Sequence, residues 1–413
     1  MPAVENAPID SDNIFVGRQP IFDRELNVRA YELLFRAGND MAANVIDGTN
    51  ATSEVIINAF LEIGMQNITN GQLAFINLTR DYITGAVPLP LEPHDVVLEV
   101  LEDIEVDDEL ITALKEMSEK GFMIALDDYV FTDDKEPLMD IVDIVKVDIM
   151  GMDPKLLSKH LPGLQKHGVK ILAEKVETQQ DFEMCMTLGF DYFQGYFFCK
   201  PNVMSGKSMP TNRLAVMEMM AKLQSPDCDF NELEGIISHD VGISYKLMRI
   251  LNSAYYSMPS KVESIHQALL LLGLKAIRNW VTVIALTNIS DKPHELIVNS
   301  LLRAQMCMEL GKRTKGSNPD MCFTVGLFST LDALMDQPLD LLLSKLPLND
   351  DIIEALTRHE GLMGRILKVV NNYEQGQWQD IEESHISPGE IRDIYFTSLR
   401  WASELASDMT QTA

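Results

Sequence analysis

The chain has 413 residues, of which 46% are hydrophobic and 23% are charged, and its formal net charge at pH 7 is −28. This length predicts two or three folded domains, and the composition is ordinary for a folded soluble protein. So strong a negative charge repels nucleic acid and anionic lipid, which argues against both as partners.

The acids are unevenly placed, because residues 1–200 hold 36 acidic and only 15 basic residues. Solubility is the simpler explanation, and a gathering of acids around cations is the alternative. No membrane insertion is expected, since the apolar runs at 268–274 and 280–286 are interrupted by Lys275, Arg278 and Asn279. An acidic N-terminus without the apolar core of a signal peptide, and five cysteines without a CxxC pair, predict a reducing cytoplasm.

Strand-like and helix-like patterns alternate through the first half of the chain. The strand-like segments are 28–35, 73–79, 96–102, 122–128, 141–149, 170–176 and 191–198, and the helix-like segments are 52–64, 107–121, 154–168 and 178–189. Glycine ends three of these helices, at Gly121, Gly168 and Gly189, and Thr178 with Asp181 resembles a capping box. The alternation predicts right-handed crossovers and a mainly parallel sheet or barrel.

The second half is helical in pattern and follows a linker at 203–212 that contains Gly206 and Pro210. We therefore predict an α/β domain over residues 10–203 and an all-helical domain over residues 212–405.

Polar residues stand at the ends of the predicted strands of the first half. They are Glu32, Asn77, Glu99, Asp127, Asp128, Lys146, Glu174 and Gln194. In a parallel barrel the strand C-termini open on one face, so these side chains are expected to converge. Oxygen ligands favour Mg²⁺, Mn²⁺ or Ca²⁺ over zinc, and two such ions suit phosphodiester hydrolysis. Taken singly, Glu32 could instead be a solvated strand end and Lys146 could pair with Asp148.

Seven motifs in the first half resemble those of the EAL family of cyclic di-GMP phosphodiesterases. In chain order they are AYELLFR, INLT, LEVLE, ALDDY, VKVD, AEKVET and FQGY, all within residues 14–201. The resemblance implies a TIM-like (β/α) barrel that hydrolyses cyclic di-GMP to linear pGpG with Mg²⁺ or Mn²⁺.

The resemblance also implies a role for each matching residue. The ligands of the first metal would be Glu32, Asn77, Glu99 and Asp127, and the second ion would be held by Asp127, Asp128 and Glu174. Lys146 would orient the attacking water. Gln19 and Arg36 would contact phosphate and base, Gln194 would border the pocket, and Glu102 and Glu177 would anchor the loop after the paired aspartates.

Three positions depart from the family pattern. Leu33 replaces alanine without removing an oxygen ligand, and Lys175 replaces glycine between Glu174 and Glu177, where it could pair with one of them. The loop at 129–136 contains no glycine, so its backbone is not expected to adopt left-handed angles freely. These departures predict weak, partner-dependent or absent catalysis.

Most of residues 215–380 resembles the HDOD domain, a helical relative of the metal-dependent HD phosphohydrolases. His239 and Asp240 spell the HD pair but stand where HDOD proteins have a helix-start turn. Ser329, Thr330 and Asn299 stand where the active relatives carry metal ligands. We therefore expect this half to be a binding module without a catalytic metal.

Two functions remain open. The chain is either an EAL–HDOD enzyme of bacterial second-messenger signalling or a degenerate cyclic di-GMP receptor or scaffold. The retained strand-end residues favour the enzyme, whereas the loop and Lys175 favour the receptor. In both cases we expect cyclic di-GMP as ligand, a protein partner at the helical half and the possibility of a homodimer.

Overall fold

The structure is a computed structural model that describes residues 14–37, 68–129, 131, 133–199, 211–252, 262–287, 289, 292–377, 381 and 386–410. The chain divides into two compact units. The first, here the barrel unit, comprises Met1–Phe197 and Glu382–Arg392, and the second, here the helical unit, comprises Phe198–Ile381 and Asp393–Ala413.

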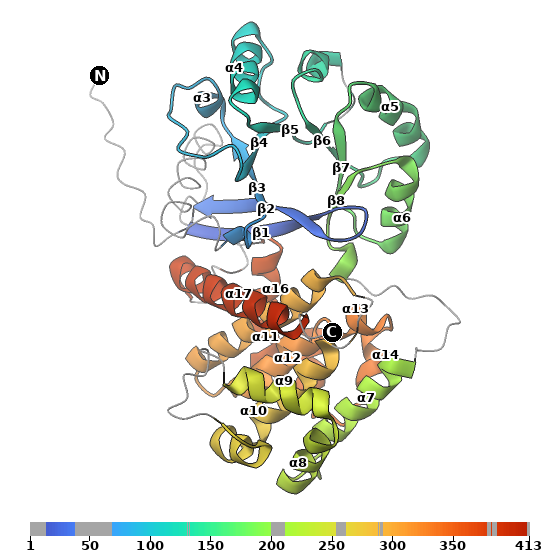
Figure 1. Cartoon of the computed structure of the whole chain (residues 1–413), viewed down its shortest axis with the longest axis vertical. Coiled ribbons are helices and arrows are strands. Elements are labelled where there is room, and N and C mark those ends of the chain that lie inside the picture. Colours follow the sequence, from blue (N-terminus) through green and yellow to red (C-terminus); the bar gives the residue numbers. More distant parts are fainter. Residues whose placement is uncertain are drawn as a thin grey trace, which may run out of the picture. The chain divides into compact units, whose positions relative to one another are not determined.

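Eight strands close the barrel in sequence order (Figure 1). They are β1 (Ile14–Phe22), β2 (Val28–Ala37), β3 (Leu73–Leu78), β4 (Val96–Val100), β5 (Met123–Leu126), β6 (Ile144–Asp148), β7 (Lys170–Glu174) and β8 (Tyr192–Gln194). The predicted barrel is confirmed, with one difference. Strand β1 was not among the predicted strands, and it runs antiparallel to both of its neighbours, β2 and β8.

Helices α4 (Asp108–Glu119), α5 (Pro154–Lys166) and α6 (Gln179–Leu188) connect β4 to β5, β6 to β7 and β7 to β8, as expected. The short helices α3 (Arg80–Ile83), η2 (Asp133–Leu138) and η3 (Phe197–Cys199) complete the described helices of this part of the chain. The capping box of Thr178 and Asp181 is present. The three glycines that follow these helices, Gly121, Gly168 and Gly189, all have positive φ, which explains why glycine stands there. The predicted helix at 52–64 lies outside the described residues.

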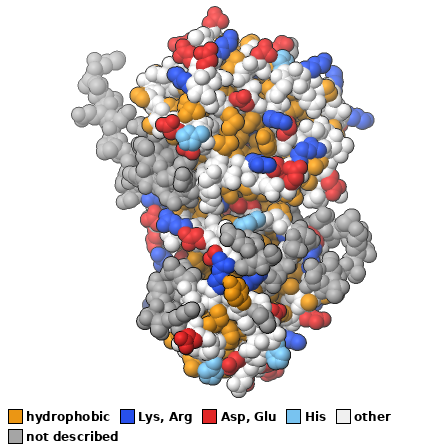
Figure 2. Space-filling view, in the orientation of Figure 1, with side chains coloured by type: hydrophobic (Ala, Val, Ile, Leu, Met, Phe, Trp, Pro, Cys, Tyr) orange, Lys and Arg blue, Asp and Glu red, His pale blue; other side chains and the backbone are white. Residues whose placement is uncertain are grey.

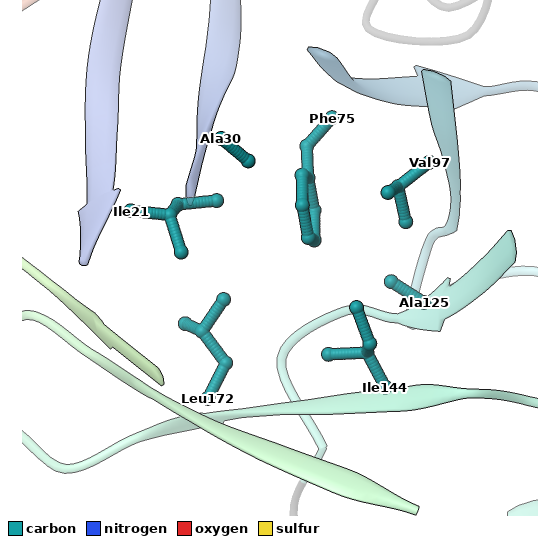
Figure 3. Packing of buried hydrophobic residues seen from close by; sticks show 7 residues of the cluster. All are labelled: Ile21, Ala30, Phe75, Val97, Ala125, Ile144 and Leu172. Carbon is teal, nitrogen blue, oxygen red and sulfur yellow. The ribbon is translucent and has the colours of Figure 1, made fainter. Parts of the chain in front are cut away.

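An apolar layer fills the interior of the barrel (Figure 3). It consists of Ile21, Ala30, Phe75, Val97, Ala125, Ile144 and Leu172, one residue from each of β1 to β7. The side chains point toward one another across the barrel axis, and all are at most 5% exposed. The barrel is therefore a packed core at this level and not a pore.

The helical unit contains helices only among its described residues. They are α7 (Thr211–Gln224), α8 (Phe230–His239), α9 (Val241–Leu251), α10 (Ile265–Thr287), α11 (His294–Arg313), α12 (Pro319–Phe328), α13 (Leu331–Met335), α14 (Leu339–Leu343), α15 (Asp350–Arg358), α16 (Gly361–Glu374) and, from Asp393 onward, α17 (Pro388–Thr410). The predicted all-helical second half is confirmed.

Helix α10 carries both apolar runs considered above and is long and apolar enough to cross a bilayer by composition. In the structure 56% of its most apolar window is buried, as is usual for a core helix. Its backbone leaves helical geometry at Gly273, where φ is 81°.

The surplus of acid is mostly a property of the surface. Red acidic side chains are interspersed with basic and apolar ones on the face shown in Figure 2. Among the described residues the buried acids are Asp23, Glu32, Glu99, Glu174 and Glu295. Few of the described acids are thus buried, and three of the buried ones belong to the site described next.

Candidate active site

The barrel interior contains a second layer of side chains, which is polar. Its position is set by that of the apolar layer. Side chains two residues apart on a strand point to the same face. Two positions after the apolar-layer members of β2 to β7 stand Glu32, Asn77, Glu99, Asp127, Lys146 and Glu174. Because β1 is antiparallel to β2, its residue at this level is Gln19, two positions before Ile21 and paired with Glu32. Gln194 holds the corresponding place on β8, opposite Ile21 of β1. We call these eight residues the polar layer.

The ammonium of Lys146 lies at the centre of the polar layer. Its Nζ atom is 2.6 Å from Glu99, 2.7 Å from Asp127, 3.0 Å from Glu174 and 3.4 Å from Glu32. The Lys146 side chain is 1% exposed and that of Glu99 is fully buried. The structure thus brings four carboxyl groups from four strands around one buried cation. The alternative in which Lys146 pairs with Asp148 is wrong.

Amide side chains complete one side of the layer. Gln194 donates from Nε2 to Glu32 at 2.5 Å and to Gln19 at 3.1 Å. Glu32 is therefore not a solvated strand end, since it is buried and has both an amide and an ammonium partner. Directly after Gln194 the chain passes close to the backbone of Val176, and this requires glycine at Gly195. A Cβ atom at this position would lie 2.1 Å from the carbonyl oxygen of Val176.

The carboxyl groups of the layer differ in charge. Burial, opposed by Lys146, raises the pKa of Glu174 to about 8 and holds that of Glu99 well above its usual range. Burial alone would lower the pKa of Lys146, but the surrounding carboxyl groups outweigh it and raise that pKa well above its usual value. At neutral pH the ammonium is charged, while most of Glu174 holds its proton.

Several oxygen atoms of the layer are buried without a hydrogen-bond partner. Among the described residues they are Asn77 Oδ1, Glu99 Oε2, Glu174 Oε2 and Gln194 Oε1. Glu99 Oε1 and Asp127 Oδ1 are not among them, because the Lys146 ammonium lies only 2.6 Å and 2.7 Å away and serves as their charged partner. Buried oxygen atoms that lack donors are the ligands that a hard divalent cation takes, so the donor set fits Mg²⁺ or Mn²⁺.

The carboxyl groups are drawn toward Lys146 and not toward a common vacant point. Accordingly, no group of three or more His, Cys, Asp or Glu side chains in the described part of the chain is arranged as a ready-made metal site. A divalent cation in this layer must therefore share the carboxyl groups with the ammonium or draw them away from it.

The loop after Asp127 contains left-handed backbone angles although it has no glycine. This differs from the expectation that a loop without glycine would not adopt such angles freely. Asp128 has φ of 41° and Phe131 has φ of 55°. Aromatic contacts hold the loop, since the Phe131 ring lies 5.4 Å from that of Tyr129 and 4.9 Å from that of His160. Side-chain packing here supports a conformation that glycine would adopt without strain.

Lys175 is also left-handed, with φ of 55°, but it does not pair with a glutamate. Its ammonium lies 2.5 Å from Asp148, and both side chains are partly exposed. The expected pairing with Glu174 or Glu177 is therefore wrong. No sequence signal pointed to this pair, nor to Lys135, whose buried ammonium donates to the carbonyl of Ile104 at 2.9 Å and secures the far end of the loop.

The remaining predicted site residues lie at the edge of the layer or outside it. Asp128 is half-buried directly after Asp127, and Glu102 and Glu177 are exposed. Glu102 makes no hydrogen bond or ion pair with any described residue, so its anchoring role stays a prediction. Arg36 belongs to β2, where its backbone pairs with Phe15, and its side chain lies outside the described ones.

Asp240 stands at a helix start, as expected, whereas His239 is exposed but is the last residue of α8 and not a helix-start residue. His239 ends α8 with Nδ1 2.6 Å from the carbonyl oxygen of Gly235. Asp240 is the N-cap of α9 and accepts a hydrogen bond from the amide of Ile243.

A buried ion pair lies beside the positions where HD enzymes carry metal ligands. Arg303 binds Glu374 at 2.6 Å and donates to Ser329 at 3.0 Å. Thr330 shares a 2.6 Å hydrogen bond with Ser300, and Asn299 contacts Cys199. Burial opposes the charge of Arg303, but Glu374 outweighs it and raises the pKa of the guanidinium.

Comparison with known proteins identifies the class to which this arrangement belongs. The EAL domain family matches residues 51–201 and the HDOD domain family matches residues 209–336. The chain belongs to the EAL–HDOD two-domain family.

Two relatives match nearly the whole chain. The uncharacterized protein YuxH of Bacillus subtilis is 32% identical over 403 residues, which are 95% of this chain and 98% of YuxH. The cyclic di-GMP phosphodiesterase CdgJ of Vibrio cholerae is 32% identical over 400 residues, which are 95% of this chain and 93% of CdgJ. A solved EAL domain protein of Listeria monocytogenes is 19% identical, covers 48% of this chain and 94% of its own, and has a TM-score of 0.36, which is too low to add to the assignment.

Proposed function

We propose that the barrel unit hydrolyses cyclic di-GMP to linear pGpG with Mg²⁺ or Mn²⁺. The observation that carries this proposal is the polar layer, in which four carboxyl groups, three amides and one ammonium lie together in the barrel interior, with Lys146 at their centre. Membership of the EAL–HDOD family and the phosphodiesterase activity named for CdgJ support the choice of substrate.

The proposed metal ligands are Glu32, Asn77, Glu99 and Asp127 for one ion, and Asp127, Asp128 and Glu174 for a second. A divalent cation, when bound, polarises the phosphate and lowers the pKa of a water molecule. The proton on Glu174 would leave when this group becomes a ligand, since ligating carboxylates are deprotonated.

Lys146 and the amides position the reactants. The ammonium of Lys146 stays charged because of its raised pKa, and as a donor it holds the attacking water in place. Gln19 and Arg36 contact phosphate and base, and Gln194, fixed by its bonds to Glu32 and Gln19, borders the pocket.

A second function, that of a cyclic di-GMP receptor or scaffold, has specific support as well. The loop after Asp127 holds left-handed angles without glycine, and Lys146 competes with metal for the carboxyl groups. In that case the layer binds the ligand without turnover, and a protein partner at the helical unit or a second copy of the chain carries the output. Either function takes place in the cytoplasm.

One experiment distinguishes the two functions. The full chain is incubated with cyclic di-GMP and Mn²⁺, and both the product and the bound ligand are quantified. The enzyme yields pGpG, and Glu32→Ala abolishes the yield while circular dichroism stays unchanged. Glu116→Ala, the same change at an exposed site on α4, leaves turnover intact. Stoichiometric binding without product identifies the receptor, and unchanged turnover in a folded Glu32→Ala protein contradicts the assigned site.

A further inference from the structure

A pocket of about 310 Å³ lies within the helical unit, apart from the residues discussed so far. Its walls come from the C-terminal end of α7, from α10 and α12, and from the segment that leads into α15. All of its lining residues belong to the described part of a single unit. The volume is at the lower end of the range of small-molecule sites.

Two cations on α10 line the pocket. Lys275 and Arg278 are three residues apart and therefore share one face of the helix. Lys275 is exposed and makes no hydrogen bond or ion pair with any residue that the structure describes. Arg278 is fixed by a hydrogen bond from Nη2 to the carbonyl of Cys228, but its Nε atom is buried without a partner in the described residues. In a chain of net charge −28, two adjacent cations without a paired carboxylate are suited to bind an anion.

A rigid polar group lies next to these cations. Asn279 donates to the carbonyl of Asp320 at 3.2 Å and accepts from Thr324 at 2.9 Å. These bonds fix the amide within the pocket wall. The half-buried carboxylate of Asp320 makes no hydrogen bond or ion pair with the described residues, so it is available to accept from a ligand.

Another part of the lining is apolar and includes Met321, Leu348 and Ile352. A free inorganic anion would gain nothing from these side chains, whereas a flat organic group would bury apolar surface against them. The pocket thus combines an anion-binding end, an acceptor and an apolar wall.

We propose that this pocket binds a small organic phosphate of the nucleoside monophosphate class. The phosphate binds Lys275 and Arg278, because two adjacent cations match its double charge better than the single charge of a carboxylate. The base lies against Met321 and Leu348 and donates to Asp320. This site is independent of the chemistry proposed for the barrel.

The test is calorimetric titration of the full chain in EDTA, which removes metal-dependent binding in the barrel. AMP and GMP are compared with adenosine, which lacks the phosphate, and with inorganic phosphate, which lacks the base. We expect at least one of the two nucleotides to bind at least tenfold more tightly than either fragment. Lys275→Ala weakens this binding at least tenfold, whereas Lys368→Ala, which removes an exposed lysine of α16 outside the pocket, leaves it unchanged.

A second variant tests the site without changing its charge. Leu348→Trp fills the pocket and abolishes binding in a protein whose circular dichroism and thermal midpoint match those of the parent. The proposal is overturned if neither nucleotide binds at 1 mM, or if a folded Lys275→Ala or Leu348→Trp protein binds as tightly as the parent. Equal affinity for inorganic phosphate overturns it too, because the apolar wall then has no role.

Discussion

Replacing Lys146 by methionine tests the electrostatic account of the polar layer. The substitution keeps most of the side-chain volume but leaves Glu32, Glu99, Asp127 and Glu174 without their common cation. Removing one partner of a buried ion pair typically destabilises a protein by about 3–5 kcal/mol. Four carboxyl groups share this lysine at 2.6–3.4 Å, so we expect a loss within that range at pH 8 in EDTA.

Mn²⁺ is expected to reverse much of this loss. A cation at a concentration of about 100 times its dissociation constant stabilises the state that binds it by about 2.7 kcal/mol. In the parent the ammonium competes for the same oxygen atoms, so Mn²⁺ raises the unfolding free energy of Lys146→Met by more than it raises that of the parent. The measurement is urea denaturation of both proteins with EDTA and with Mn²⁺.

Lys135→Met is the matched control for this experiment. Lys135 is also a buried lysine of the barrel unit, but its ammonium donates to a single carbonyl, that of Ile104. Its replacement is expected to lower stability by about 1–3 kcal/mol and to leave the effect of Mn²⁺ unchanged. If Lys146→Met is no less stable than Lys135→Met in EDTA, or gains no more than the parent from Mn²⁺, Lys146 is not the charge that holds the carboxyl groups together.

Three further predictions concern protons, the loop and the helical unit. Because Glu174 has a pKa of about 8 in the fold against 4.5 ordinarily, the folded state binds more protons between these values. The unfolding free energy in EDTA therefore falls as pH rises from 4.5 to 8. Calorimetry in two buffers at pH 7 detects the protons that are released when Mn²⁺ binds. An unfolding free energy that does not change with pH, together with no proton release, contradicts the raised pKa. A variant that combines Lys175→Gly with a glycine-rich loop at 129–136 relieves the strain of left-handed backbone angles, which is about 1–2 kcal/mol per residue. We expect its turnover, measured across a Mn²⁺ titration, to exceed that of the parent severalfold. If the parent is equally fast, the loop does not limit turnover. In the Glu32→Ala protein the barrel site is removed, so any metal that remains must be held by the helical unit. Elemental analysis finds no stoichiometric iron or manganese in this protein, because Asn299, Ser329 and Thr330 stand where metal ligands would be needed. Stoichiometric metal in this protein refutes the prediction.

The polar layer was predictable from the sequence because strands alternate with a period of two. Once an apolar residue such as Val97 or Ile144 faces the barrel axis, Glu99 and Lys146 must face it too. Convergence then follows from the closure of the barrel. Which carboxyl groups surround the lysine depends on distances of a few ångströms between strands, and these do not follow from the pattern. The competing pairs Lys146–Asp148 and Lys175–Glu174 were equally plausible from the sequence.

Strand β1 was missed for a different physical reason. Its sequence contains Gly17 and Pro20, and proline within a strand pattern normally argues against a strand interior. The structure accommodates Pro20 because β1 pairs with β8 only at Ile21 and Phe22. Over most of its length β1 therefore resembles an edge strand, in which a missing amide donor is tolerated.

The two units illustrate how a count of charges separates a metal site from a structural ion pair. In the barrel one ammonium faces four carboxyl groups, so negative charge and unbonded oxygen atoms remain for a divalent cation. In the helical unit the guanidinium of Arg303 is matched by Glu374 alone, and burial raises the pKa of the nearby Asp332, which disfavours a second carboxylate. A divalent cation at this place would have to displace Arg303 from Glu374, the only carboxylate that pairs with Arg303 among the described residues. It would gain no second carboxylate. A buried protein cation among acids thus leaves carboxyl groups in excess around Lys146 but a matched pair at Arg303 and Glu374.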